Sequence, residues 1–285
     1  MNEQLDTNRI KQSQRELWNA SAAGWMRSWK RIEEFGQPVS DRLVALALLK
    51  PGDLVLDVAT GIGEPALTAA RRILPGGLVI GTDQSRAMLD MGVKRAKQAG
   101  LTNVEFREAD GEGLDVFPDQ HFDAVLCRWG LMFMPNLVVA LSGFRRVLKK
   151  ERRFATSVWG PPLACPMITA ADEEVRRIAK LPPPPPGTPH PCNLGDHQKV
   201  ARALSEAGFR EISHEHLDAV IAFESAEDFI ETRSGLSATF REMMGKLPPG
   251  TQAELKQAIA EAIERYRDSD GQIRLHNQAV CWSAN

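Results

Sequence analysis

The sequence predicts an α/β protein with a doubly wound open sheet whose strands are mostly parallel. Between Gly52 and Trp159, short apolar runs alternate with amphipathic helical stretches, which is the pattern of a parallel sheet covered by helices on both faces. The apolar runs are also continuous, as in strands that are buried on both sides. In sheets of this kind, ligands bind in the crevice at the carboxyl ends of the strands.

Five strands and the helices between them follow in order along this region. The expected strands are apolar runs at residues 54–58, 78–81, 104–106, 122–127 and 154–159. The expected helices carry apolar residues at helical spacing and lie at about 65–73, 85–99 and 137–148. Ser85 can cap the second of these helices, and Gly100 lies where that helix should end.

The C-terminal part is expected to complete the sheet around a helical insertion. Asp196 can cap a helix that Gly208 ends, and a strand should follow to about Phe223. The chain then divides into four parts: an N-terminal helical cap (1–45), a ligand-binding core (46–160), a proline-rich connector or lid (161–195), and the rest of the core (196–285), which has a helical insertion at about 225–268 and a last strand at about 273–282.

Composition excludes several classes of protein. The formal net charge of −2 in 285 residues provides no basic field for a nucleic acid. The polar N-terminus and the absence of an apolar run of about 20 residues favour a cytoplasmic protein without a membrane span. The four cysteines are widely scattered, and no spacing typical of a metal site or a disulfide framework is present. We therefore expect free thiols and no metal.

Two features outside the expected core have alternative interpretations. The N-terminal helix carries a stripe of Trp18, Ala22, Trp25, Trp29 and Ile32. The stripe serves either for packing alone or, through Trp25 or Trp29, as the wall of a substrate pocket. The run of five prolines from Pro182 to Pro186 is either a stiff polyproline connector or a docking ligand for a partner domain.

The most informative motif is the segment from Asp57 to Glu64, which joins a buried strand to a helix. Gly61 and Gly63 allow a tight turn and close approach of the backbone to a ligand. The pattern of Gly61, Gly63 and Ala66 also fits a dinucleotide fingerprint, and an acid, Asp83, lies 20 residues beyond Gly63. However, a carboxylate at Asp57 would repel a pyrophosphate and would suit a cationic ligand.

These motifs together resemble the class I S-adenosylmethionine-dependent methyltransferases, most closely those of the ubiquinone/menaquinone-biosynthesis type. The resemblance runs from about Trp18 to the C-terminus and is strongest from Leu54 to Trp159. The matching segments are residues 56–64, Asp83, Ala109-Asp110, Phe122-Asp123-Ala124-Val125 and Arg145-Arg146-Val147-Leu148-Lys149. The resemblance implies a seven-stranded, mostly parallel Rossmann-like sheet with an antiparallel last strand and helical cap insertions.

The resemblance also implies a cofactor and the residues that bind it. S-adenosyl-L-methionine would donate a methyl group to an oxygen, nitrogen or carbon nucleophile of a small-molecule acceptor. The implied cofactor-binding residues are Asp57, Ala59, Thr60, Gly61, Gly63, Asp83, Gln84, Met88, Ala109, Asp110, Gly111, Cys127, Arg128 and Trp129. Asp57 would face the methionine portion, Asp83 the ribose hydroxyls and Asp110 the adenine amino group. The simpler alternatives are a helix cap for Asp83, a turn residue for Asp110 and a surface ion pair for Arg128.

The sequence departs from the family pattern in three places. Ala59 stands where many members have glycine. Residues 150–152 are Lys-Glu-Arg in place of a proline-glycine-glycine turn before the fifth strand. Residues 114–116 are Leu-Asp-Val in place of a leucine-proline-aromatic step, which affects the loop that would cover the cofactor.

Catalytic residues are not fixed by any spacing in this sequence. The candidates are His190, His276 and Arg128, whereas His214 and His216 are assigned a structural role. Trp25, Trp29 and Met132 are candidates for the substrate pocket. A second hypothesis is that the N-terminal helix, residues 161–195 and residues 225–268 together cap the crevice. Two other functions remain open at this point: an NAD-dependent oxidoreductase and a non-catalytic S-adenosylmethionine-binding protein.

Overall fold

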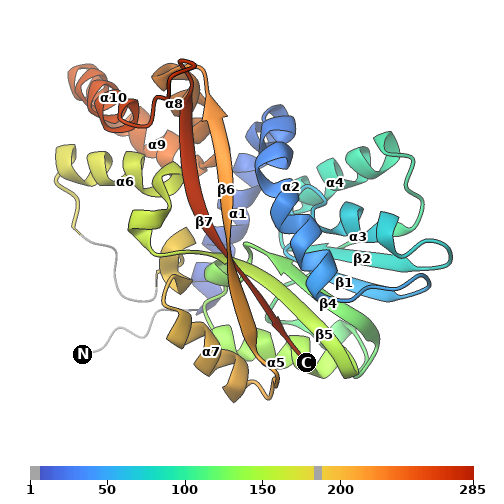
Figure 1. The fold of residues 1–285 in the computed structure, drawn as a ribbon. Helices are drawn as coiled ribbons and strands as arrows, with labels where there is room; N and C mark the ends of the chain where they lie inside the picture. Colours follow the sequence, from blue (N-terminus) through green and yellow to red (C-terminus); the bar gives the residue numbers. More distant parts are fainter. Residues whose placement is uncertain (1–6, 183–187) are drawn as a thin grey trace, which may run out of the picture.

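The computed structural model describes residues 7–182 and 188–285 and contains a seven-stranded sheet (Figure 1). The strands are β1 (Leu54–Val58), β2 (Leu78–Asp83), β3 (Val104–Glu108), β4 (Phe122–Arg128), β5 (Leu148–Trp159), β6 (Ser213–Phe223) and β7 (Ile273–Ala284). Their order across the sheet is β3-β2-β1-β4-β5-β7-β6, and only β7 runs antiparallel to its neighbours. The predicted fold, including the antiparallel last strand, is therefore confirmed.

Helices cover both faces of this sheet. They are α1 (Thr7–Arg27), α2 (Trp29–Leu46), α3 (Ala66–Arg72), α4 (Arg86–Gln98), α5 (Leu137–Val147), α6 (Pro166–Ile178), α7 (His197–Glu206), α8 (Ala226–Leu236), α9 (Ala238–Lys246) and α10 (Pro249–Glu264). Figure 1 shows α2, α3 and α4 on one side of the sheet and α5 and α7 on the other. Between the two layers, the side chains of Phe122, Phe144 and Phe154 are fully buried.

Strand register places the ends of the first three strands at one edge. Asp57 of β1 pairs with Gly81 of β2, and Asp83 of β2 pairs with Glu108 of β3. Beyond the strands, the backbone N–H of Thr60 donates to the carbonyl of Thr82 at 2.8 Å, and that of Ala109 donates to the carbonyl of Asp83 at 3.0 Å. The loops after the three strands are therefore tied together into one rim.

The fifth strand is longer than the sequence predicted. The helix α5 ends at Val147 and β5 begins at the next residue, Leu148. The Lys-Glu-Arg segment belongs to the strand, with Glu151 at φ 57°, and the pairing with β4 shifts register there. Ion pairs of Arg152 with Asp53 and Asp123 hold the segment in place. The irregular strand thus takes the place of the proline-glycine-glycine turn that is typical of the family that the sequence resembles.

The N-terminal cap consists of two helices rather than one. The helical stripe from Trp18 to Ile32 is interrupted at Ser28, which separates α1 from α2. The second helix crosses one face of the sheet over β4, β5, β7 and β6. The first helix instead packs against α8, α9 and α4, and this arrangement places α1 over the rim.

The two other cap segments differ from each other. Within the segment 225–268, three helices follow one another, namely α8, α9 and α10. The segment 161–195, expected to be a connector, contains the thirteen-residue helix α6, which packs against α10. Pro182 is the last described residue of the proline run, and residues 183–187 lie outside the described residues, so the interpretations of the run stay predictions. Among the described residues, no helix is long and apolar enough to cross a membrane.

Candidate active site

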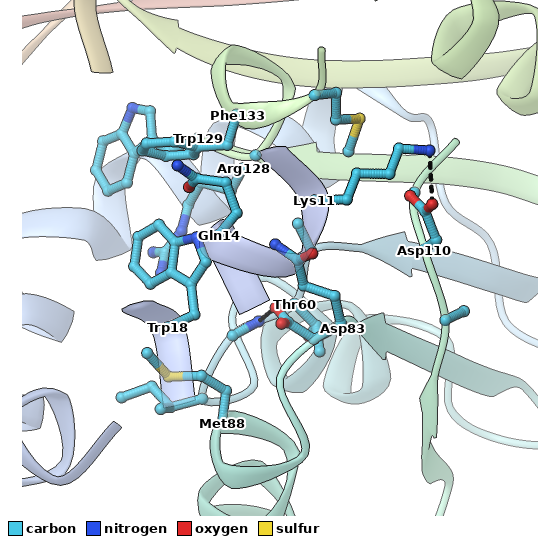
Figure 2. Close-up of a pocket in the computed structure, with 18 of the residues that line it drawn as sticks. Lys11, Gln14, Trp18, Thr60, Asp83, Met88, Asp110, Arg128, Trp129 and Phe133 are labelled. Atoms are coloured by element: carbon cyan, nitrogen blue, oxygen red, sulfur yellow. Dashed lines mark hydrogen bonds and ion pairs between the residues drawn. The ribbon is translucent and has the colours of Figure 1, made fainter. Parts of the chain in front are cut away.

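A pocket opens at the carboxyl ends of β1, β2, β3 and β4, beneath helix α1 (Figure 2). It has about 930 Å³ of space between its walls, counting the solvent at its mouth. Its lining residues are Lys11, Gln14, Trp18, Trp25, Ala59, Thr60, Gly61, Ile62, Glu64, Asp83, Gln84, Met88, Ala109, Asp110, Gly111, Arg128, Trp129, Gly130, Phe133, Met134 and Pro135.

The glycine-rich turn forms the floor of this pocket. Ala59, Gly61 and Gly63 all have positive φ angles, of 56°, 56° and 110°. Such angles are strained for alanine but not for glycine, which accounts for the glycine at the position of Ala59 in many members of the family that the sequence resembles. The turn is closed by a hydrogen bond from the N–H of Gly63 to the carbonyl of Thr60. The backbone is thereby exposed to a ligand without side chains in the way.

Asp83 connects the turn to the next helix. Its Oδ2 accepts a hydrogen bond from the N–H of Gly61 at 2.9 Å, and its Oδ1 accepts one from the N–H of Ser85 at 2.8 Å. Burial raises the pKa of Asp83 to about 6. The cap of helix α4 is Ser85, whose hydroxyl accepts from the N–H of Met88. Asp83 is therefore not the cap itself, and its carboxylate faces the pocket with two fixed backbone donors behind it.

Asp110 lies on the loop after β3, and an ion pair covers it. Its Oδ1 accepts from the N–H of Glu112, and its Oδ2 lies 2.7 Å from Nζ of Lys11, a residue of α1. Lys11 is also 2.7 Å from the carboxylate of Glu112. Burial alone lowers the pKa of Lys11, but the two carboxylates raise it overall. The turn at Asp110 thus also presents a carboxylate to the pocket, and α1 is fastened to it.

Asp57 does not line the pocket but lies fully buried beneath the turn. Its Oδ2 accepts from the N–H of Ala66, at the start of α3, at 3.0 Å. Burial raises the pKa of this carboxyl to about 7. Asp57 therefore supports the turn through the start of α3, while its other oxygen, Oδ1, is buried without a hydrogen-bond partner among the described residues.

Near the glycine-rich turn, the acid that lines the pocket is Glu64. One oxygen of its buried carboxylate accepts from the hydroxyl of Thr68 at 2.7 Å, and the other, Oε1, has no hydrogen-bond partner among the described residues. Burial raises the pKa of Glu64, although the positive charge of Arg128 opposes this effect. Sequence analysis included Glu64 in the motif without assigning it a role.

Arg128 and Trp129 form the far wall. The guanidinium of Arg128 donates to the carbonyl of Gly36 and the hydroxyl of Ser40, both on α2. It is not a surface ion pair. Burial lowers the pKa of Arg128, while Glu64 and Asp57 counteract this. Cys127, the residue before Arg128, is fully buried and does not line the pocket.

Aromatic side chains concentrate on this side of the pocket. Trp129 stacks on Trp159 with ring centroids 4.2 Å apart. Trp18 meets Phe133 edge to face at 5.0 Å and Trp25 at 6.0 Å. In Figure 2, Trp18 and Trp129 lie on one side and Lys11 and Asp110 on the other, with Asp83 between. The pocket therefore has an acidic side and an aromatic side.

Several residues that the sequence singled out lie elsewhere. Gly63 shapes the turn without lining the pocket, and Met132 is buried in the main core. Trp29 packs in a small cluster with Ile62 and Met88, where the guanidinium of Arg95 lies 5.0 Å from its ring. Of the two tryptophans considered for a substrate pocket, the structure brings only Trp25 to the site.

The two candidate histidines are not in the pocket. Nδ1 of His190 accepts a hydrogen bond from the N–H of Cys192, and Nε2 lies 3.5 Å from Asp172. His276 is exposed on β7, with Nδ1 2.6 Å from the carboxylate of Asp218. Both rings are engaged away from the rim, so neither has access to a ligand bound there.

The contribution of α1 to the side of the pocket opposite the turn was missed in the sequence. Lys11, Gln14 and Trp18 follow each other at helical spacing, so one face of α1 lines the pocket together with Trp25. The apolar stripe was visible in the sequence, but its polar extension toward Lys11 had no pattern that distinguished it from a solvated helix face. Ile62, Gly130, Phe133, Met134 and Pro135 also line the pocket without having been predicted.

Comparison with known proteins agrees with this geometry. The methyltransferase domain family matches residues 55–151. The chain is 31% identical to nocamycin O-methyltransferase of Saccharothrix syringae, over 69% of this chain and 73% of that protein. It is 30% identical to ubiquinone/menaquinone biosynthesis C-methyltransferase UbiE of Pseudomonas entomophila (strain L48), over 72% of this chain and 80% of that protein.

A solved structure shares the fold. The YcgJ protein of Bacillus subtilis superposes with a TM-score of 0.56 at 19% identity, covering 86% of this chain and 96% of that one. At this identity the likeness concerns the fold, whereas the sequence relatives concern the family. Together they decide between the two interpretations of the glycine pattern: the chain belongs to the class I S-adenosylmethionine-dependent methyltransferases.

Proposed function

We propose that this pocket binds S-adenosylmethionine across its acidic side and methylates a small molecule held at its aromatic side. The observation that carries the proposal is the meeting of Asp83 and Asp110, from the ends of neighbouring strands, in one pocket with Trp18, Trp25 and Trp129. A nucleoside offers hydroxyl and amino donors to carboxylates, and such charge-assisted hydrogen bonds are among the strong ones.

Each acidic residue has a place in this assignment. Asp83, held rigid by Gly61 and Ser85, would accept from the ribose hydroxyls. Asp110 would accept from the adenine amino group, next to the backbone of Gly111. Gln84 and Met88 line the wall between them and would flank the ribose and the adenine.

Glu64 would hold the cationic end of the cofactor. Its Oε1 is buried and without a partner among the described residues, and an unpaired buried acceptor is costly unless a ligand satisfies it. A positively charged amino group would supply that partner. Sequence analysis assigned this role to Asp57, whose Oδ1 is also buried without a partner among the described residues, but of the two acids only Glu64 lines the pocket.

The protein contributes to the transfer mainly by alignment. When bound, S-adenosylmethionine supplies an electrophilic methyl group on a sulfonium centre. Trp18, Trp129 and Phe133 would exclude water and hold the acceptor in line with that group, and holding two reactants in line accounts for a large part of the rate of such reactions. Among the described residues, those lining the pocket include no histidine. The site therefore favours acceptors that need little help in losing a proton.

Fewer segments cover the pocket than the hypothesis from the sequence expected. Among the described residues of the three cap segments, only those of α1 line the pocket, while α8 and α9 pack against α1 from behind. Trp25 donates from Nε1 to the carbonyl of Leu236, and the N–H of Ala238 donates to the hydroxyl of Ser21. We propose that α8 and α9 brace α1 as a wall that restricts the acceptor to compact molecules and excludes polymers.

The atom that receives the methyl group is left open by the relatives, since their names include an O-methyltransferase and C-methyltransferases. The net charge of −2 favours a small acceptor over a nucleic acid.

Two measurements test the proposal. Titration calorimetry should show binding of S-adenosylhomocysteine and no binding of NADH. Transfer of a radiolabelled methyl group should then be measured on a panel of small phenols, amines and quinols. Turnover of one class identifies the acceptor atom. Absence of S-adenosylhomocysteine binding by the folded protein would contradict the pocket assignment.

A further inference from the structure

Three histidines meet on the sheet at a distance in the fold from the pocket. His197 is the first residue of α7, and His214 and His216 lie on the edge strand β6. One ring nitrogen from each lies within 4.8 Å of the other two. Residues two apart on a strand project from the same face, and the packing of α7 brings the third ring to them.

Each of the three histidine rings is held in place by a different neighbour. His214 stacks on the buried Trp282, with centroids 4.4 Å apart at 27°. Nδ1 of His216 lies 3.1 Å from the side-chain amide of Gln278 on β7. The ring centroid of His197 is 4.9 Å from that of each of the other two. The three imidazoles are therefore oriented before any ligand arrives.

One nitrogen in the group lacks a partner. Nε2 of His197 is buried and has no hydrogen-bond partner among the described residues. A buried polar atom in this state calls for a bound water or ion.

We propose that His197, His214 and His216 bind one divalent transition-metal ion of the zinc class. Imidazole nitrogens suit zinc, copper and nickel, and zinc at 2.0–2.1 Å from each nitrogen in tetrahedral geometry holds them roughly 3.4 Å apart. Reaching this spacing from the present one, in which the nitrogens lie within 4.8 Å of one another, requires the side chains to rotate. His214 and His216 are exposed, so a fourth position remains open to water.

Gln278 is the positioning residue of this site. A flip of its side-chain amide interchanges the oxygen and the nitrogen. The oxygen of Gln278 then accepts from Nδ1–H of His216, and Nε2 of His216 is left free to bind the metal. Partners of this kind, hydrogen-bonded to the second nitrogen of a ligating histidine, typically change metal affinity by 10–100-fold.

The site is separate from methyl transfer. β6 pairs antiparallel with β7, and β7 pairs antiparallel with β5, so β6 is parallel to β5. Through β7, His214 lies level with Thr156 and His216 with Val158 of β5. The histidines are therefore separated from the pocket sideways, because β5 and β7 lie between β6 and β4, the nearest strand whose end lines the pocket. None of the three histidines lines that pocket. A metal here would join α7 to the edge strand and stabilise the fold.

The test uses the full chain without a polyhistidine tag, stripped of metal by a chelator and dialysed. Zn²⁺ and Co²⁺ are then added separately. We expect one equivalent of Zn²⁺ by elemental analysis, visible absorption bands of low-symmetry Co²⁺, and a higher melting temperature with Zn²⁺. Less than a tenth of an equivalent bound under these conditions would overturn the proposal.

Variants assign the ligands. His214→Gln/His216→Gln should abolish the Co²⁺ bands and the zinc-dependent rise in melting temperature, and Gln278→Ala should weaken binding about 10–100-fold. His276→Ala removes a histidine from the same sheet outside the group and should bind like the wild type. Binding of S-adenosylhomocysteine reports whether each variant is folded. Metal binding that persists in the double variant, or that is lost equally in His276→Ala, would overturn the assignment.

Discussion

Nζ of Lys11, on the first helix, lies 2.7 Å from the carboxylate of Asp110, on the loop after the third strand. The two residues are 99 positions apart in the sequence. Their ion pair fastens α1 across the mouth of the pocket, at the end where we place the adenine. The helix that forms the wall and the loop that would recognise the base are therefore mechanically connected.

The first prediction concerns this contact. Lys11→Ala should raise the dissociation rate of S-adenosylhomocysteine up to about fivefold, because a partly exposed ion pair contributes at most about 1 kcal/mol. The difference from the wild type should shrink at high salt, which screens such pairs. Stopped-flow displacement measures the rate.

A matched control is Arg15→Ala, which removes a positive charge from an exposed position on the same helix. Its dissociation rate should equal that of the wild type. If both variants release the ligand faster by the same factor, the effect belongs to the net charge of α1 and not to its contact with Asp110.

The second prediction concerns Asp83. Asp83→Asn keeps one oxygen that can accept a hydrogen bond but removes the charge that faces the ribose. Hydrogen bonds to a charged group contribute about 1.5–3 kcal/mol, so the dissociation constant for S-adenosylhomocysteine should rise at least about tenfold by calorimetry. Asp90→Asn, at an exposed position on α4, is the control. Equal affinity of the Asp83 variant and the wild type would place the ribose elsewhere.

Much of the fold follows from local patterns in the sequence. The caps at Ser85 and Asp196 each accept hydrogen bonds from the first turn of their helix, as predicted. The turn glycines and the ends of the strands are set by neighbouring residues alone. Sequence patterns therefore located the rim correctly. Helix α6 was missed because the prolines that surround it suggested an extended chain, whereas Pro166 stands at the first position of the helix, where proline is tolerated.

The parts of the site that could not be predicted depend on long-range packing. A sequence pattern shows that Asp57 ends a buried strand, but the direction of its side chain is set by the start of α3. In the same way, His197 meets His214 and His216 only through the packing of α7 on the sheet. No regular spacing connects them, and the sequence therefore indicated no metal site.

The third prediction concerns the pH dependence of stability. The carboxyl of Asp57 titrates near 4 in the unfolded chain and at about 7 in the folded protein, because of its burial. Between these values the folded state binds more protons, so the free energy of unfolding falls as the pH rises from about 4 to 7. A pKa change of this size corresponds to a loss on the order of 4 kcal/mol.

Asp57→Asn cannot ionise and retains an oxygen for the N–H of Ala66. Urea unfolding at pH 5 and pH 8 should therefore show a smaller decrease in stability for this variant than for the wild type. Asp115→Asn, whose native side chain is 98% exposed, should keep the full decrease. An unchanged decrease in Asp57→Asn would mean that Asp57 is ionised at neutral pH in the folded protein.

The fourth prediction separates the two tryptophans of the N-terminal stripe. Trp25 lines the pocket and donates from Nε1 to Leu236, whereas Trp29 packs away from it beside Arg95. Trp25→Phe removes one neutral hydrogen bond and part of the aromatic wall. The bond alone contributes about 0.5–1.5 kcal/mol, so the KM for the acceptor should rise about 2–10-fold. The affinity for S-adenosylhomocysteine should stay the same, because the substitution leaves the acidic side of the pocket unchanged.

Trp29→Phe makes the same chemical change four residues further along the stripe, and its acceptor KM should equal that of the wild type. The comparison is informative because both residues looked alike in the sequence. A KM effect confined to Trp25 supports the acceptor position at the aromatic side. Equal effects in both variants would mean that the position of α1 as a whole, and not direct contact, sets acceptor affinity. The bracing of α1 by α8 and α9 would then be the feature that determines specificity.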